Sequence, residues 1–184
     1  TASFFIRKKM LDSIIKKIEQ NLSKERFEHT LRVTETVFKL SQSYDVDQDK
    51  LKLSAFLHDS AKYETPDTFK LKGIELSVDE VSLYKIFPSI WHAFLGPKYI
   101  SHTFDITDPE ILSPVKWHTT GKETMSLTEK LLFVADFIEP GRKLPMTQYV
   151  EDLSQLSLDT AVLAVSQFGL FHLLKMKSYC LLYC

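Results

Sequence analysis

The sequence is poor in the residues that mark several classes of protein. Its two cysteines, Cys180 and Cys184, lie four positions apart, a pattern that fits neither a disulfide framework nor a zinc site built from cysteines. Glycine occurs only five times, while leucine, lysine and phenylalanine are plentiful, which favours helices. The formal net charge is −1, so the chain lacks the excess of basic residues that nucleic-acid binding requires. No nucleic-acid partner is therefore expected.

Long apolar runs are also missing. No run reaches the roughly 18 residues that a membrane-spanning helix needs, so no membrane partner is expected. The first residues, 1–5, lack the layout of a signal peptide. Lysines are interleaved with the apolar residues of 4–21, and we interpret them as a solvated face, because acidic residues balance them elsewhere. With so few cysteines, the chain is expected in the reducing cytoplasm.

The sequence does contain helical periodicity. Apolar residues recur three and four positions apart, and no segment alternates with a period of two. Capping residues mark several helix starts: Ser23, Asp47 and the capping boxes Ser77–Glu80 and Ser126–Glu129. Helices are therefore predicted at about 4–21, 23–44, 48–58, 77–87, 88–102, 109–121 and 126–138, with a short one from Pro66 and one or two more over 147–179.

The predicted fold is all-α, a compact single-domain bundle of roughly seven to nine helices over residues 1–184. The motifs discussed below occupy 26–145, and the C-terminal helices lie within 147–184. In the helix after Ser23, Leu31 and Phe38 are expected on or near the inner side. Pro114 is expected to kink its helix or delay its start, because proline has no backbone N–H to donate.

The stretch from Ala55 to Lys62 ends an apolar helix with the pair His58–Asp59. Adjacent side chains within a helix point about 100° apart, but at a helix end an imidazole and a carboxylate can converge on one ion. A neutral nitrogen ligand beside an anionic oxygen ligand suits iron, manganese or zinc. Taken alone, the dipeptide is better explained by a capping aspartate beside a surface histidine, so the remaining histidines and carboxylates decide between the two interpretations.

Asp136 is the second informative residue, because it is the one charged side chain in the apolar run 131–138. A carboxylate buried there needs a hydrogen bond, a metal ion or a salt bridge to a nearby lysine or arginine. Three further histidines lie near predicted helix ends or core-facing sides: His29, His92 and His118. The other two, His102 and His172, are not part of a comparable pattern, and we interpret both as structural or surface residues.

The order of these residues resembles a known family. A histidine, then the pair His58–Asp59, then the distant Asp136 resembles the HD superfamily of metal-dependent phosphohydrolases. Further motifs resemble its YqeK-like members, the symmetrical bis(5′-nucleosyl)-tetraphosphatases: His58-Asp59-Ser60-Ala61-Lys62, Trp91-His92-Ala93, His118-Thr119-Thr120-Gly121 and Ala135-Asp136-Phe137-Ile138-Glu139-Pro140-Gly141-Arg142.

The resemblance implies a bundle of the HD-domain type that binds iron or a similar metal, as one ion or two, and splits diadenosine tetraphosphate into two ADP. By the same resemblance, the metal ligands are His29, His58, Asp59 and Asp136. His29 and Asp136 would thereby also border the substrate. The family usually ends in a segment rich in Asn, Arg and Thr that helps to hold the nucleotide, whereas this chain has the residues 175–184 there. The family also suggests a homodimer.

The resemblance further implies groups that handle the phosphates. His92 and His118 would face the phosphates or a second metal, and Lys62, Thr119 and Arg142 would contact the phosphates. This agrees with elementary chemistry. Polyphosphate repels a nucleophile, and a bound cation neutralises that charge and acidifies water. Protonated histidines could also stabilise the developing charge, and an arginine offers a fork for phosphate oxygens.

Two other functions remain open from the sequence. One is a nucleotidase or another HD phosphohydrolase that acts on mononucleotides, since the metal core is shared. The other is a catalytically silent HD module that senses nucleotides. The silent module is disfavoured because every expected ligand position is filled. The products separate the two enzymes, since symmetrical cleavage yields two ADP and no free phosphate.

Overall fold

The computed structural model describes residues 2–175 and contains only helices in that range. The prediction of an all-α fold is confirmed. Cys180, Cys184 and all but the first residue of the segment 175–184 lie outside the described residues. The helices are α1 (Ala2–Asn21), α2 (Lys24–Ser41), α3 (Gln48–Leu57), α4 (Pro66–Leu71), α5 (Val78–Ile86), α6 (Pro88–Phe104), α7 (Pro109–Trp117), α8 (Leu127–Ile138), α9 (Thr147–Leu156) and α10 (Leu158–Lys175).

The predicted helix starts are confirmed by their caps. The side chain of Ser23 accepts a hydrogen bond from the backbone of Arg26, and Asp47 caps α3 in the same way. Both predicted capping boxes form, at the starts of α5 and α8. These side chains satisfy N–H groups that a helix start leaves without a partner. Local sequence therefore fixes where the helices that carry the site begin.

The helix count differs from the prediction, because the described residues contain ten helices instead of seven to nine. Thr65 and Thr68 form a capping box that supports the short α4. Ser157 has extended backbone angles, which divide the last stretch into α9 and α10. Pro114 lies inside α7 without delaying its start, since the helix begins at Pro109. Pro109 itself costs no hydrogen bond, because it occupies the first helical position, where the backbone N–H has no partner within the helix.

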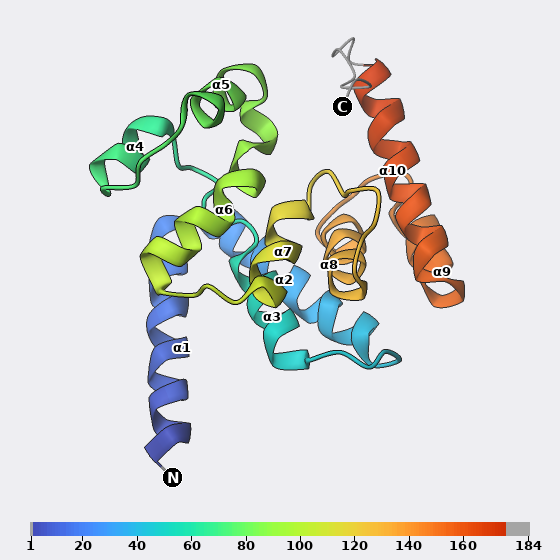
Figure 1. Ribbon diagram of the computed structural model, residues 1–184. Coiled ribbons are helices and arrows are strands. Elements are labelled where there is room, and N and C mark those ends of the chain that lie inside the picture. Colours follow the sequence, from blue (N-terminus) through green and yellow to red (C-terminus); the bar gives the residue numbers. More distant parts are fainter. Residues whose placement is uncertain (1, 176–184) are drawn as a thin grey trace.

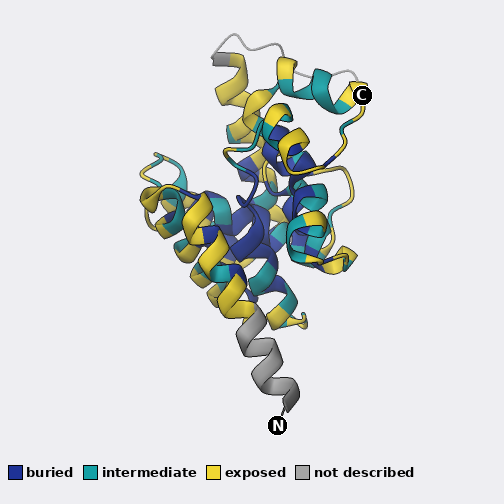
Figure 2. Cartoon of the chain, turned by 90° about the vertical axis from the view of Figure 1, so that its left-hand side faces the viewer, coloured by how far each residue is buried: buried dark blue, intermediate teal, exposed yellow. Residues whose placement is uncertain are grey.

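The core consists of two groups of buried apolar side chains that meet along α3. Leu51 and Ala55 of α3 pack with α2, α8, α9 and α10, whereas Phe56 and Leu57 pack with α1, α6 and α7. Ser54, on the same helix, donates a hydrogen bond to the carbonyl of Ile111 and so links α3 to α7. Figure 2 shows this buried interior at the centre of the chain. The C-terminal end of α3 therefore lies deep inside the protein.

Two positions expected near the inner side of α2 are exposed. Leu31 is 46% exposed and Phe38 is 39% exposed. The buried face of α2 is formed by Val33 and Val37, one turn apart, and the exposed ring of Phe38 instead lies 3.8 Å below the ammonium of Lys52. The apolar stripe of α2 is therefore narrower than its composition suggests.

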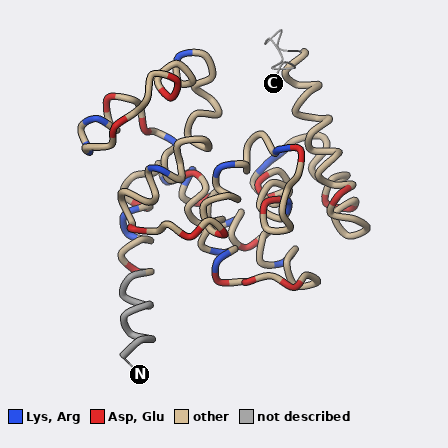
Figure 3. The backbone as a smooth tube through the Cα atoms, in the orientation of Figure 1, with Lys and Arg blue, Asp and Glu red and all other residues tan. Residues whose placement is uncertain are grey.

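The helices surround a central group (Figure 1). α2, α3, α7 and α8 form the centre, α4 and α5 extend to one side with the start of α6, and α9 and α10 lie on the other. α1 extends away from the centre toward the N-terminus. Acidic and basic residues are interspersed along the chain (Figure 3). No helix within residues 2–175 is both long and apolar enough to cross a membrane.

Candidate metal centre

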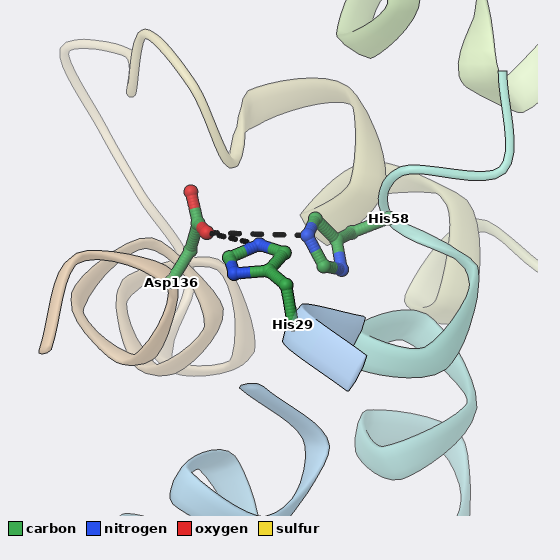
Figure 4. Close-up of side chains that lie close together, drawn as sticks. All are labelled: His29, His58 and Asp136. Atoms are coloured by element: carbon green, nitrogen blue, oxygen red, sulfur yellow. Dashed lines mark ion pairs between the residues drawn. The ribbon is translucent and has the colours of Figure 1, made fainter. Parts of the chain in front are cut away.

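Side chains from distant parts of the chain meet at the centre of the bundle. His29 comes from α2, His58 follows α3 and Asp136 comes from α8 (Figure 4). The Nε2 atoms of His29 and His58 lie 3.1 and 3.9 Å from one oxygen, Oδ1 of Asp136. Each of the three residues can offer one ligand atom within 4.8 Å of the others, so together they could hold a metal ion.

His58 and His118 are oriented by the helices that they end. Each is the C-cap of its helix, α3 or α7. Their Nδ1 atoms lie 2.6 and 2.7 Å from the carbonyl oxygens of Ala55 and Val115, three residues earlier. A carbonyl only accepts, so each Nδ1 carries the hydrogen and each Nε2 is left with its lone pair. In the neutral imidazoles, both lone pairs are therefore available to a metal ion.

Asp59 lies between two sets of histidines. Its Oδ2 lies 3.5 Å from Nε2 of His58 and 3.8 Å from Nε2 of His29. Its Oδ1 lies 3.0 Å from Nε2 of His92 and 3.8 Å from Nε2 of His118. His58, Asp59 and His118 form a second group that could hold a metal ion. One carboxylate thus offers an oxygen to each set.

The residues expected at the phosphates lie on the edge of this cluster. Nζ of Lys62 lies 3.1 Å from Nε2 of His92 and 3.4 Å from Oδ1 of Asp59. Arg142 donates from Nη2 to Oδ1 of Asp136 at 2.7 Å. The side chain of Lys62 is 27% exposed and that of Arg142 is 33% exposed. Thr119 is exposed beside His118, and its role at the phosphates stays a prediction.

Charges in the cluster control the protonation states of its members. Burial acts to raise the pKa of Asp59, but His58, His92 and Lys62 outweigh it and hold the pKa well below its usual range. Burial likewise acts to raise the pKa of Asp136. The contact with His29 and the charge of Arg142 lower this pKa by more than burial raises it. Both carboxylates are therefore ionised at neutral pH, as metal ligands must be.

The pKa values of the histidines shift in two directions. Burial lowers the pKa of His118 to about 3 and also lowers the pKa of His92, against the opposing charge of Asp59. For His58, burial acts in the same direction, but the carboxylates of Asp59 and Asp136 outweigh it and raise the pKa. His92 and His118 are thus neutral at neutral pH. The role of protonated donors that the sequence suggested for them stays a prediction.

Several buried polar atoms in the cluster have no hydrogen-bond partner within the described residues. They are Nε2 of His29, Nε2 of His58 and Oδ1 of Asp59. Leaving such atoms unpaired in a protein interior is costly. All three belong to groups that ligate metals, and the mix of imidazole nitrogen and carboxylate oxygen matches iron, zinc or manganese. The donor set therefore fits a metal ion.

Three contributors were not identified from the sequence. Oε1 of Glu139 lies 3.0 Å from Nδ1 of His29, and Arg32 holds the same carboxylate from Nε at 2.6 Å. Arg26 donates to Oδ2 of Asp59 at 3.0 Å. The three-residue spacing of Arg26 and His29 on one helix could have indicated a shared face. No local pattern connects Glu139 with Arg32, because 107 positions separate them.

The comparisons with known proteins agree with this geometry. The family model for the HD domain matches residues 26–141. A symmetrical bis(5′-nucleosyl)-tetraphosphatase of Staphylococcus aureus is 38% identical over 155 residues, which cover 81% of this chain and 77% of that protein. The enzyme of the same name from Halalkalibacterium halodurans is 33% identical and is covered over 78% of its length, with 80% of this chain aligned.

A solved structure also resembles the fold. It is the crystal structure of a predicted HD superfamily hydrolase involved in NAD metabolism from Clostridium acetobutylicum. The two structures superpose with a TM-score of 0.79 and 25% sequence identity, over 92% of this chain and 90% of that chain. With the matched HD domain and the relatives above, it follows that this chain belongs to the HD-domain family and, within it, to the symmetrical bis(5′-nucleosyl)-tetraphosphatases.

Proposed function

We propose that this protein hydrolyses diadenosine tetraphosphate symmetrically into two ADP, with a metal ion bound by its histidine and aspartate cluster. The observation that carries the proposal is the convergence of His29, His58, Asp59 and Asp136 from distant parts of the chain. Nε2 of each histidine lies within 4 Å of an oxygen of Asp59 and of an oxygen of Asp136. They do so in a chain of the tetraphosphatase family. Family membership supplies the substrate class, and the cluster supplies the chemistry.

The ligand assignment is part of the proposal. His29, His58, Asp59 and Asp136 would hold one ion, and iron is the metal we favour, because two nitrogen and two oxygen ligands suit it. A second ion is supported by Asp59, whose Oδ1 faces His92 and His118. Neutral His92 and His118, with unprotonated nitrogen available, fit ligands of that ion better than charged phosphate donors. When bound, the metal supplies positive charge against the polyphosphate and acidifies water.

The chain's own cations would orient the substrate. Lys62 and Arg142 already pair with carboxylates of the cluster, so their charged groups lie where phosphate oxygens would approach the metal ligands. Arg26 joins them through Asp59. An arginine can hold two phosphate oxygens at once, whereas a lysine acts as a point charge. These three side chains would bind the tetraphosphate and offset charge that develops on the leaving phosphate.

The experiment is a product analysis with purified, metal-loaded protein. Diadenosine tetraphosphate is incubated with the enzyme, and the nucleotides are separated by chromatography. We expect ADP alone, and no reaction after chelation. Release of inorganic phosphate from mononucleotides at a higher rate would instead favour the mononucleotide phosphohydrolase. Binding without turnover of either substrate, with metal content verified, would favour the sensing module.

A cytoplasmic location is part of the same proposal, supported by the low cysteine content. A homodimer stays a prediction that follows from the family resemblance.

A further inference from the structure

A cavity of about 220 Å³ lies beside the candidate metal centre. Its lining comes from the segment after α3, from α5 and from the start of α6, which form the side part of the molecule in Figure 1. Two of the lining residues, Lys62 and His92, also belong to the metal cluster. The cavity is therefore continuous with the place where phosphates are expected.

Aromatic side chains form the walls of this cavity. Tyr63 is 55% exposed, and its hydroxyl lies 2.9 Å from that of Ser23. Tyr84 is half-buried and packs edge-on against Trp91, with ring centroids 5.1 Å apart. Trp91 is almost wholly buried and donates from its indole nitrogen to the carbonyl of Glu80. The walls thus combine a fixed floor with two tyrosine rings that reach solvent.

The cavity is lined by one basic and one acidic side chain, Lys62 and Glu64. Lys62 brings a positive charge next to the metal ligands. Glu64 also lines the cavity, its side chain is 10% exposed, and its carboxylate lies 3.2 Å from the ammonium of Lys72. A carboxylate repels phosphate but accepts hydrogen bonds from hydroxyl and amino groups. An uncharged ligand group would therefore be favoured beside Glu64, and a phosphate would be favoured beside Lys62 and the metal ligands.

We propose that this cavity binds the nucleoside of one half of the substrate, with the base against Tyr63 and Tyr84 and the phosphates entering the metal centre past Lys62. The inference rests on the proposed function, which supplies the dinucleotide. A site for a whole drug-sized ligand measures roughly 300–1,000 Å³, so 220 Å³ suits one nucleoside and leaves the other half of the substrate outside. Aromatic faces stack on any base, which suits a purine.

The cavity lies between the segment after α3 and the start of α6, both of which the structure describes completely.

The experiment compares two ligands by calorimetry on the metal-loaded, full-length protein. ADP carries a base, whereas pyrophosphate carries only the phosphates. The variants are Tyr63→Ala and Tyr84→Ala, with Tyr63→Phe and Tyr84→Phe to keep the rings. The control is Tyr149→Ala on α9. Tyr149 has an exposed fraction of 53%, similar to the 55% of Tyr63, and it does not line the cavity. Tyr63→Ala removes a ring outside the core and so leaves folding intact.

We expect the two alanine variants to bind ADP about 5- to 140-fold more weakly, the loss typical of one base–aromatic stack. Pyrophosphate binding, both phenylalanine variants and Tyr149→Ala should remain at the wild-type level. Equal loss of ADP and pyrophosphate, or unchanged ADP binding in both alanine variants, would overturn the inference. Binding is measured without turnover, so a wild-type protein that binds ADP but does not cleave diadenosine tetraphosphate would refute the proposed function and leave this inference standing.

Discussion

Glu139 places its Oε1 3.0 Å from Nδ1 of His29, so a buried carboxylate stands directly behind an imidazole whose Nε2 faces the metal cluster. Arg32 and the backbone N–H of Gly141 hold the other oxygen of that carboxylate, each at 2.6 Å. A carboxylate in this position fixes the tautomer and the orientation of a metal-binding histidine. The loop after α8 therefore positions His29 as well as Arg142.

The first prediction concerns Glu139→Gln. The amide keeps the shape but loses the charge that holds His29 and Arg32, so metal affinity should fall about 10- to 100-fold. Metal titration against a competing chelator measures it. Glu123→Gln, at an exposed position on another loop, is the matched control. Equal affinity in Glu139→Gln and the wild type would show that His29 needs no such support.

The second prediction concerns Gly141→Ala. A Cβ atom at this position would collide with the guanidinium of Arg32, which would have to leave Glu139. The buried carboxylate would lose its main partner, so the free energy of unfolding should fall by about 1–3 kcal/mol. Gly169→Ala is the control, because nothing lies within 4 Å of its new methyl group and alanine favours a helix. Urea unfolding of both variants decides it, and a Gly141→Ala protein as stable as the wild type would contradict the collision.

The third prediction concerns Arg142→Ala. Its Nη2 contacts Asp136 at 2.7 Å, so the guanidinium lies beside the metal ligands without belonging to them. Turnover of diadenosine tetraphosphate should drop about 100- to 1,000-fold, with metal content unchanged. Arg142→Lys should recover only part, because a lysine cannot make the paired contact. Lys143→Ala, at the exposed next position, is the control. Full turnover in Arg142→Ala would remove this residue from the mechanism.

The fourth prediction concerns pH and a residue outside the site. Glu129 is buried, and its carboxylate accepts from Lys122 at 2.7 Å and from the backbone of Ser126 at 2.6 Å. Burial acts to raise its pKa, but Lys122 and Ser113 outweigh it and lower the pKa from 4.5. A lowered folded-state pKa means that this stabilisation is present above about pH 4.5 and is lost as the pH falls further.

Glu129→Gln should therefore be less stable than the wild type at neutral pH, and the difference should shrink between about pH 5 and pH 3. Urea unfolding across that range measures the difference. Glu123→Gln again serves as the control, with no change expected. A difference that stays constant with pH would mean that the ionised carboxylate of Glu129 contributes nothing to stability.

Local patterns were sufficient to predict much of the fold and of the cluster. Ser23, Asp47 and Ser126 mark helix starts by themselves, because a cap depends on neighbouring residues alone. His58 was found because it ends an apolar helix, and Asp136 because a carboxylate in an apolar run needs a partner. The structure brings both to one point, as the prediction required.

The rest depended on tertiary packing, which no local pattern records. The sequence indicates no role for Glu139 beyond its place in the motif 135–142, because its contact with His29 spans 110 positions. Leu31 and Phe38 are apolar but lie beside the stripe that Val33 and Val37 bury. The protonation of His118 was also beyond the sequence, since it depends on burial beside His58 and His92.

The most direct test of the central claim is hydrolysis in water enriched in the heavy oxygen isotope, followed by mass spectrometry of the nucleotides. Attack of water on an inner phosphate of diadenosine tetraphosphate should give only ADP, with one of each pair of ADP molecules carrying a single heavy oxygen on its terminal phosphate. The label should disappear, with the activity, in Asp136→Asn protein that has lost its metal. Formation of AMP and ATP, or of ADP without label, by metal-loaded wild-type protein would contradict symmetrical hydrolysis at this site.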